Sequence, residues 1–425
     1  MDAFDHRSIG QKLDLFHFQE EGPGMVFWHP KGWALYRLIE GYIRRRMKAA
    51  GFQEIKTPQI LARAFWEKSG HWQKFGPHMF ALEDGERQFA VKPMSCPGHL
   101  QIFNSRLRSY RDLPLRYAEF GACHRNEPSG ALLGLMRTRA FVQDDAHVLC
   151  RMDQVAEEVK RFSQLLRMVY RDFGFADFAV AFSTRPALRE GSEELWDVAE
   201  RVLQGAARGA GLDFDLQPGE GAFYGPKLEF SLQDRLGRRW QCGTIQLDLV
   251  LPEKLGAHYV GEDGASEVPI MIHHAVLGSL ERFIGMLLEH WQGRLPLWLA
   301  PDQVLIAAVS DQHLGYAEEA AIQLESEGYR VTLDASNETL PKKIVAWRER
   351  GVPILGVVGA REVEKYRISL RTLADDVRTD LPLGEAGAWI KRVAARQYTV
   401  TAMASAGEEG APIGSPYDLG LVEQI

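Results

Sequence analysis

Cysteine and long apolar runs are both scarce in this chain. Only four cysteines occur among 425 residues, and their spacing forms no paired framework. Sparse, unpaired cysteines favour a reducing compartment over a disulfide-stapled secreted scaffold. No uninterrupted apolar run reaches the roughly 18 residues of a membrane-spanning helix. The N-terminus also lacks the basic and apolar regions of a signal peptide. We therefore expect a cytoplasmic protein with no membrane partner.

An excess of positive charge is missing as well. The chain has 50 Lys and Arg against 57 Asp and Glu, a net charge of −7. A nucleic-acid partner would therefore have to be held by local basic patches, because phosphate binding depends on clustered cations. A phosphate-binding P-loop is absent too. The nearest glycine cluster, residues 219–227, places Pro226 before Lys227 and has no following hydroxyl residue, which argues against a P-loop nucleotidase.

What is present first is the pattern of an α+β protein. Apolar residues recur at helical spacing over 32–50 and 153–173, and each run ends at a glycine. Short β-rich runs, punctuated by turns, occupy 52–57, 87–92, 115–123, 228–232 and 240–250. Strands clustered without regular alternation with helices predict an antiparallel sheet flanked by helices.

The pattern changes at the proline-punctuated segment 295–301. Beyond it, strands over 304–309, 330–334, 352–358 and 366–371 alternate with helices over 316–327 and 340–350, the order β-α-β-α-β-β of a small α/β domain. We expect domains at 1–298 and 299–400. The segment 401–425 is rich in Ala, Gly and Glu with little periodicity, and is expected to be a disordered tail.

Two arginines lie in informative contexts. Arg125 follows a predicted strand and lies two residues before Glu127, so both side chains are expected to face the same side. Arg282 lies in the first turn of a helix that Gly278 and Ser279 begin. A helix N-terminus with an added guanidinium is a strong anion site, and Glu127 can accept from an exocyclic amine. The combination suits a nucleoside triphosphate bound on an antiparallel sheet.

Together these segments resemble motifs 2 and 3 of the class II aminoacyl-tRNA synthetases. The run 116–150 is similar to the threonyl-tRNA synthetase family in particular, and the helix, strand and Pro58 of residues 32–58 resemble the dimer-forming motif 1. The segment after 299 resembles the family's anticodon-binding domain. The resemblance spans nearly all of 5–400 but not the family's N-terminal editing region, so we expect no editing domain in this chain. The implied fold is the class II catalytic domain followed by a small α/β domain.

The resemblance also implies roles for individual residues. A Zn²⁺ site would use Cys96, His147 and His273, with His274 as a neighbour that makes the choice of ligand ambiguous. The threonine pocket would consist of Gln143, Asp145, Tyr224, Gln246 and Ser279. ATP, with Mg²⁺, would be bound by Arg125, Glu127, Arg137, Phe141, Gln241 and Arg282. Catalytic roles are expected for Arg125 and Arg282, for Lys227 nearby, and for His71, which would assist transfer to the tRNA ribose.

In the C-terminal domain the resemblance points to anticodon-reading residues. These are Asn337, Glu338, Glu362 and Arg371. Polar side chains at strand and helix ends are the expected readers of splayed bases. Beyond Arg371, Asp375 and Asp376 stand where the family usually has a basic turn, so we expect weaker phosphate contacts here.

The function implied is ligation of L-threonine to tRNA(Thr) by a homodimer, with ATP as co-substrate. Zinc with an open coordination position would separate threonine from valine, which an apolar pocket does poorly. Two alternatives remain open. One is a paralogue that activates a β-hydroxy amino acid for an acceptor other than tRNA. The other is a synthetase-like regulator without catalysis.

Overall fold

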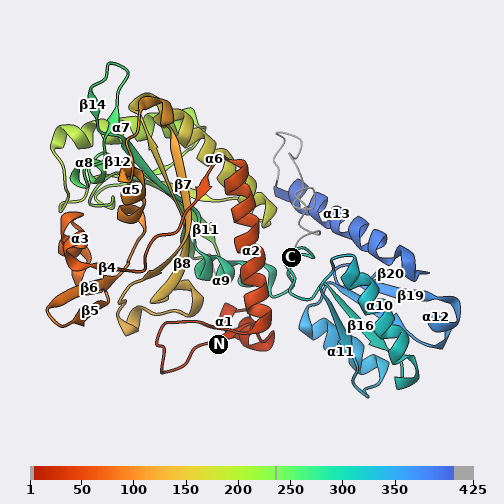
Figure 1. Cartoon of the computed structure of the whole chain (residues 1–425). Coiled ribbons are helices and arrows are strands. Elements are labelled where there is room, and N and C mark those ends of the chain that lie inside the picture. The colour runs from red at the N-terminus through yellow and green to blue at the C-terminus, as the bar shows by residue number, and fades with distance from the viewer. Residues whose placement is uncertain (1–3, 235–236, 406–425) are drawn as a thin grey trace.

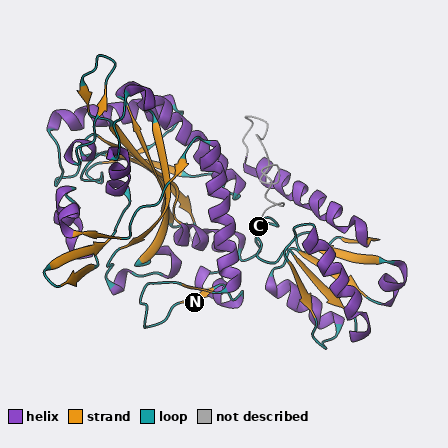
Figure 2. Ribbon diagram, in the orientation of Figure 1, coloured by secondary structure: helices purple, strands orange, loops and turns teal. Residues whose placement is uncertain are grey.

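The computed structural model describes residues 4–234 and 237–405 and divides them between two sheet-based bodies (Figures 1 and 2). The larger body, at the N-terminal side, is built on an eight-stranded sheet. The smaller one, at the C-terminal side, is built on a five-stranded sheet. This α+β order, with the α/β domain second, confirms the predicted fold class.

The large sheet is antiparallel through its centre. Its order is β10-β9-β11-β12-β15-β8-β7-β3, and only the two edge pairs, β10 with β9 and β3 with β7, are parallel. Its strands are β3 (Gln53–Glu54), β7 (Leu115–His124), β8 (Ala140–Cys150), β9 (Ala179–Ser183), β10 (Asp215–Gln217), β11 (Lys227–Gln233), β12 (Arg239–Asp248) and β15 (Ile270–Ser279).

Long helices bury one face of this sheet. They are α2 (Pro30–Ala49), α6 (Val155–Asp172), α7 (Glu193–Gly209) and α9 (Leu280–Trp291). Their apolar stripes share one core with inward residues of β8, β11, β12 and β15. This arrangement follows from the helical periodicity of each segment. It leaves the polar side chains of the same strands on the opposite face.

The remaining elements of the larger body are shorter. They are α1 (His6–Lys12), β1 (Phe16–His17), β2 (Phe27–Trp28), β4 (Ile60–Ala62), α3 (Arg63–Lys68), α4 (His71–Phe75), β5 (Ala81–Asp84), β6 (Arg87–Val91), α5 (Cys96–Asn104), α8 (Leu251–Lys254), β13 (Tyr259–Val260) and β14 (Ser266–Glu267). Among them, α1 and β1 pack into the same core as the long helices. None of the helices in the described part of the chain combines the length and apolarity needed to cross a bilayer.

The smaller body has the sheet order β17-β16-β18-β19-β20, with the first three strands parallel. Its elements are β16 (Val304–Ala308), α10 (Leu314–Ser326), β17 (Val331–Asp334), α11 (Leu340–Arg350), β18 (Ile354–Val358), α12 (Ala360–Lys365), β19 (Arg367–Thr372), β20 (Arg378–Pro382) and α13 (Ala386–Ser405). The sequence pattern did not predict α12, β20 or α13. Helix α13 continues past the expected boundary at 400, and the rest of the predicted tail, 406–425, lies outside the described residues.

The structure differs from expectation most in the middle of the large sheet. The predicted strand over 52–57 is reduced to β3, and no strand was predicted over 140–150 or 270–279. Every residue of β15 from Ile270 to Leu277 is buried. A central strand covered on both faces loses the alternation that identifies a strand in sequence. The two central strands that the sequence pattern did not predict, β8 and β15, carry much of the site described next.

Candidate active site

A polar cavity of about 650 Å³ opens on the uncovered face of the large sheet. It is lined by the side chains predicted for the catalytic domain, with one exception, His71. The predicted residues around it are Cys96, Arg125, Glu127, Arg137, Phe141, Gln143, Asp145, His147, Tyr224, Lys227, Gln241, Gln246, His273, Ser279 and Arg282.

Sheet register explains why residues so distant in sequence meet here. On β8, Gln143, Asp145 and His147 alternate with buried neighbours and therefore share one face. His147 lies opposite His273 of β15, and His273 lies opposite Gln246 of β12. A single row across neighbouring strands thus supplies two imidazoles and an amide.

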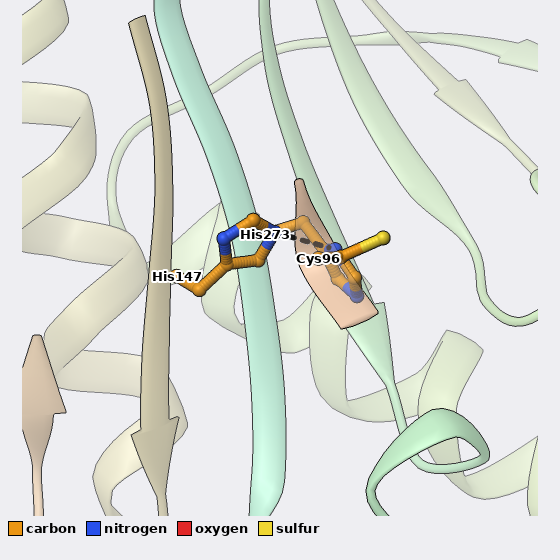
Figure 3. A group of neighbouring side chains, drawn as sticks. All are labelled: Cys96, His147 and His273. Atoms are coloured by element: carbon orange, nitrogen blue, oxygen red, sulfur yellow. Dashed lines mark hydrogen bonds between the residues drawn. The ribbon is translucent and has the colours of Figure 1, made fainter. Parts of the chain in front are cut away.

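Three potential metal ligands converge at one end of this row (Figure 3). Cys96, at the first turn of α5, and the two histidines are all buried, and their ligand atoms lie within 4.8 Å of one another. Nε2 of His147 is 3.0 Å from Nδ1 of His273. His274, on the same strand, instead packs its ring against Phe52 and Phe162. One sulfur and two imidazole nitrogens form a donor set typical of zinc.

The surroundings of the three ligands also suit a cation. The other nitrogen of His273 lies 2.8 Å from Asp248 Oδ2, and the other nitrogen of His147 lies 2.8 Å from Nδ1 of His99. Burial lowers the pKa of His147 and so favours the neutral imidazole that a metal requires. Burial raises the pKa of the Cys96 thiol, which only a nearby positive charge would reverse.

The opposite end of the cavity contains the arginines. Helix α9 begins as predicted, with Ser279 as N-cap accepting a hydrogen bond from the Arg282 N–H. The Arg282 guanidinium donates to the main-chain carbonyls of Met136 and Gln241, each at 2.9 Å. Burial lowers the pKa of this arginine. Its charge is held at a fixed place where an anion can reach it.

A second group holds the predicted adenine-binding residues. The Arg125 guanidinium lies 5.1 Å from the centre of the Phe141 ring, and Arg125 Nε donates to the carbonyl of Pro93. Arg137 forms an ion pair with Glu127 at 2.8 Å. Without ATP, Glu127 is therefore held in an ion pair with Arg137. We expect Arg137 to break this ion pair when it contacts a triphosphate.

The residues predicted for the amino acid form the pocket between these ends. The Tyr224 hydroxyl donates to Gln246 Oε1 at 2.6 Å, and its ring stacks on His273. Asp145 Oδ1 lies 3.8 Å from His147 Nε2, and burial raises the pKa of this carboxyl. Lys227, predicted nearby, forms an ion pair with Glu229 at 2.7 Å.

Two buried carboxyl groups that the sequence did not single out organise this site. Asp144 accepts three main-chain hydrogen bonds of 2.9 Å, from the N–H groups of residues 276, 277 and 278. Glu281 accepts from the N–H of Val142 at 3.0 Å and lies 3.0 Å from the Ser279 hydroxyl. Burial raises the pKa of each carboxyl group to about 7. Asp144 ties β8 to the end of β15, and Glu281 ties β8 to the start of α9.

His99 is a third residue that the predictions omitted. It follows Cys96 by three positions in α5, a spacing that places both side chains on one face of a helix. The Cys-x-x-His spacing was the available signal. His99 is fully buried, and its Nε2 lies 3.2 Å from Glu119 Oε2. Burial raises the pKa of Glu119, but hydrogen bonds from His99, Thr57 and Lys92 more than offset this and lower it below its ordinary value.

His71, predicted to assist transfer to the tRNA ribose, does not line the cavity in this structure. It is fully buried, and its two nitrogens contact the Ser69 hydroxyl at 2.8 Å and the Met94 sulfur at 2.8 Å. Burial lowers its pKa to about 3. A residue behind Met94 and Cys96 reaches a substrate in the cavity only if the chain around it moves.

The predicted anticodon readers do not all lie together. Asn337 and Glu338 follow β17 and Glu362 follows β18, so these three lie at the carboxyl ends of parallel strands. Glu362 is buried and accepts from the Gly359 N–H, which caps α12. Arg371 lies opposite Leu355, near the start of β18, and pairs with Asp376. The register therefore separates Arg371 from the other three.

Comparison with known proteins gives consistent results. The tRNA synthetase class II core domain (G, H, P, S and T) matches residues 79–291, and the anticodon-binding domain matches residues 303–393. The threonine–tRNA ligase of Caulobacter vibrioides is 58% identical over 90% of this chain. This chain spans 58% of the length of that relative.

Two solved structures share the whole architecture. The RNA-binding domain of threonyl-tRNA synthetase from Cryptosporidium parvum superposes with a TM-score of 0.88 at 39% identity, over 91% of this chain and 98% of that one. A chain described as threonyl-tRNA synthetase ThrRS-1 from Aeropyrum pernix gives a TM-score of 0.80 at 28% identity, over 96% and 98% of the two chains.

Proposed function

Since this chain belongs to the threonyl-tRNA synthetase family of the class II aminoacyl-tRNA synthetases, we propose that it ligates L-threonine to tRNA(Thr) at the expense of ATP. The observation that carries the proposal is one cavity with a Cys-His-His group at one end and the Arg125 and Arg282 guanidinium groups at the other. The amino acid and the triphosphate would meet between them.

The chemistry needs two displacement steps. The threonine carboxylate attacks the α-phosphorus of ATP, forming threonyl-adenylate and releasing pyrophosphate with Mg²⁺. A ribose hydroxyl at the tRNA terminus then attacks the acyl carbon, the hydroxyl proton is lost, and AMP leaves. Arg125 and Arg282 would stabilise the charge on the phosphates, and Phe141 would stack on adenine. Positioning and fixed charge account for this kind of catalysis without a covalent enzyme intermediate.

Selection of threonine would depend on the metal group. Cys96, His147 and His273 would hold Zn²⁺, which when bound leaves coordination open for the amine and hydroxyl of threonine. Asp145, on the same face of β8 as His147, would accept a hydrogen bond from an N–H of that amine. Valine offers no hydroxyl and would be refused, whereas serine offers both groups and would be accepted to some extent.

A second copy of the chain would cover the edge of the large sheet. In the described part of the chain, the edge strand β3 pairs with β7 alone, so its outer side has no strand partner. A hollow of about 400 Å³ beside it is lined by Ile43, Met47, Phe52 and Phe120, with charged residues such as Arg44 and Glu54 among them. Unpaired edges beside apolar surface favour association. Sedimentation equilibrium should give twice the chain mass, and a monomer at micromolar concentration would contradict the proposal.

The decisive experiment is aminoacylation of total tRNA by the purified protein, with labelled threonine, serine and valine in parallel. We expect strong charging with threonine, some with serine and none with valine. Arg371, a predicted anticodon reader, is already engaged by an ion pair. This favours keeping one alternative, in which threonine is transferred to an acceptor other than tRNA. Threonine-dependent pyrophosphate exchange without tRNA charging would favour that alternative, and absence of both activities would favour a non-catalytic regulator.

A further inference from the structure

A buried row of five side chains runs behind the metal group. It connects Glu119, His99, His147, His273 and Asp248, in that order. The successive contacts are 3.2, 2.8, 3.0 and 2.8 Å long. All five side chains are buried.

Both ends of the row can only accept hydrogen bonds. Glu119 already accepts from Lys92 Nζ at 2.9 Å and from the Thr57 N–H and hydroxyl at 3.0 and 2.8 Å. Asp248 Oδ1 accepts from the N–H groups of Val250 and Leu251. Because both carboxyl groups already accept from at least two donors, the oxygen of each that faces the row is expected to accept as well. The two terminal imidazoles must therefore donate outward, His99 to Glu119 and His273 to Asp248.

The row then has one N–H group fewer than it has contacts to fill. A metal-binding imidazole has to be neutral, and each neutral imidazole carries one N–H. Three protons serve the four contacts. The two terminal contacts take one each, so the His147 proton fills either the contact with His99 or the contact with His273. Whichever contact is left empty has two nitrogen lone pairs facing each other.

The position of Cys96 decides between the two arrangements. Its sulfur belongs to the group formed with His147 and His273, where a cation would lie between the facing lone pairs. Among the described residues, no group of potential metal ligands includes His99, and the His99–His147 contact is only 2.8 Å long. The His147 proton therefore lies on Nδ1 and points at His99.

We propose that His99, oriented by Glu119, is a positioning residue that sets the tautomer of His147 and thereby presents Nε2 of His147 to a bound metal. This inference rests on the proposed function, because it assumes the zinc site. It assigns a role to a residue that would touch neither metal nor substrate. Residues in such outer positions typically change metal affinity by about 10- to 100-fold.

Two substitutions of His99 separate hydrogen bonding from packing. In His99→Phe the ring volume is retained, but nothing accepts from His147. In His99→Asn the carboxamide oxygen can take the place of Nδ1, although a void is left. If His99 acts through the hydrogen bond, the Asn variant binds zinc more tightly than the Phe variant. If it acts only through packing, the order is reversed.

The measurement is the dissociation constant for Zn²⁺, obtained by competition with a chromophoric chelator on the full-length variants. We expect weakening of about 10- to 100-fold for His99→Phe and recovery of most of this loss in His99→Asn. His124→Asn is the matched control. His124 ends β7, its buried Nδ1 has no hydrogen-bond partner among the described residues, and it does not line the cavity.

The outcomes are distinguishable from failure of the proposed function. Equal zinc affinity in wild type and His99→Phe, or tighter binding by the Phe variant than by the Asn variant, would overturn the role of His99 alone. A wild-type protein that binds no zinc would overturn the metal site itself. Circular dichroism of each variant checks that it is folded, and the Asn variant provides the test if the Phe variant is not.

Discussion

Among single residues, main-chain groups hold Arg282 in the cavity and hold the buried Asp144 and Glu281 behind it. Arg282 donates to two carbonyl oxygens, and within the described residues no carboxylate forms an ion pair with it. Asp144 and Glu281 are held by N–H groups. Main-chain partners keep a charged group in place without neutralising it, so Arg282 remains available to an anionic ligand.

Cys96 is the residue whose loss should separate amino-acid selection from nucleotide binding. Replacing it with alanine removes one of three ligands, and we expect zinc content to fall to background and threonine-dependent pyrophosphate exchange to fall by at least about 100-fold. Metal analysis and exchange assays measure the two effects. Cys150→Ala, a buried cysteine outside the cavity, is the control. Full exchange activity in a metal-free Cys96→Ala protein would refute the zinc assignment.

Glu281 should make stability depend on pH. Burial raises its pKa from 4.5 to about 7. Between these values the folded protein binds more protons than the unfolded chain, so the free energy of unfolding falls as pH rises and levels off above about 7. The loss amounts to about 3 kcal/mol. Glutamine keeps the contacts to Val142 and Ser279 but does not titrate.

Denaturant unfolding of wild type and Glu281→Gln at several pH values tests this expectation. The stability of the variant relative to wild type should increase between about pH 5 and about pH 8, by up to about 3 kcal/mol. Parallel pH profiles for the two proteins would show that Glu281 is not protonated in the native state.

At the scale of elements, the join between β15 and α9 decides where the phosphate-binding end lies. Ala275 pairs with Asp145 and Ser279 pairs with Gln143, so β15 has two extra residues against β8 at this point. Gly278 in this bulge has φ +78, and a Cβ there would lie 2.5 Å from the Cys242 carbonyl oxygen. The bulge leaves N–H groups of β15 without strand partners, and the Asp144 carboxyl group accepts hydrogen bonds from them. The bulge fixes the direction in which α9 begins.

Asp144→Asn should therefore impair catalysis indirectly, by changing the position of α9. The carboxamide nitrogen would face main-chain N–H groups, which costs about 1–3 kcal/mol of stability. The resulting shift of α9 should lower kcat for pyrophosphate exchange by about 100-fold, since misplacement by about 1 Å can have that effect. Asp334→Asn, which alters a similar cap in the smaller domain, is the control. A variant that loses stability but keeps kcat would contradict the positioning role.

At the scale of the whole molecule, two hydrophobic cores are joined by a buried linker. Trp298 packs against Tyr42 and Phe173 of the larger core, while Leu297 belongs to the smaller one. Lys31 forms an ion pair with Asp302 at 2.7 Å, and Arg330 donates to the carbonyls of Trp298 and Ala300. The linker is thus held on both sides. A tRNA bound to both domains would meet a defined arrangement of the two.

Recognition of tRNA by the smaller domain should be limited by its own acidic turn. Asp376 forms ion pairs with Arg371 and Arg348. We expect Asp376→Asn to release both arginines, lower KM for tRNA by a few-fold and steepen its salt dependence by about one unit for each cation that engages a phosphate. Pyrophosphate exchange should not change. Asp263→Asn, an equal change of charge between β13 and β14, is the control. An unchanged salt slope would show that neither arginine meets the phosphate backbone.

Local sequence patterns were enough to predict much of the outline of this protein. Helical periodicity predicted α2 and α6, and the Gly-Ser start of α9 placed Arg282 correctly in a first turn, because such signals are local. The resemblance to a known family supplied most of the cavity-lining residues. Composition and periodicity alone would not have found them, since Cys96, His147 and His273 are far apart in the chain.

Which of these groups touch depends on the tertiary fold. The fold placed His99 and Asp248 behind the metal group, separated Arg371 from the other predicted anticodon readers, and buried His71 behind the cavity-lining Met94 and Cys96. Strand register and bulges determine such contacts, and a register shift of one residue turns every side chain to the other face. That information is carried by pairing between distant segments, so no local pattern in the sequence contains it.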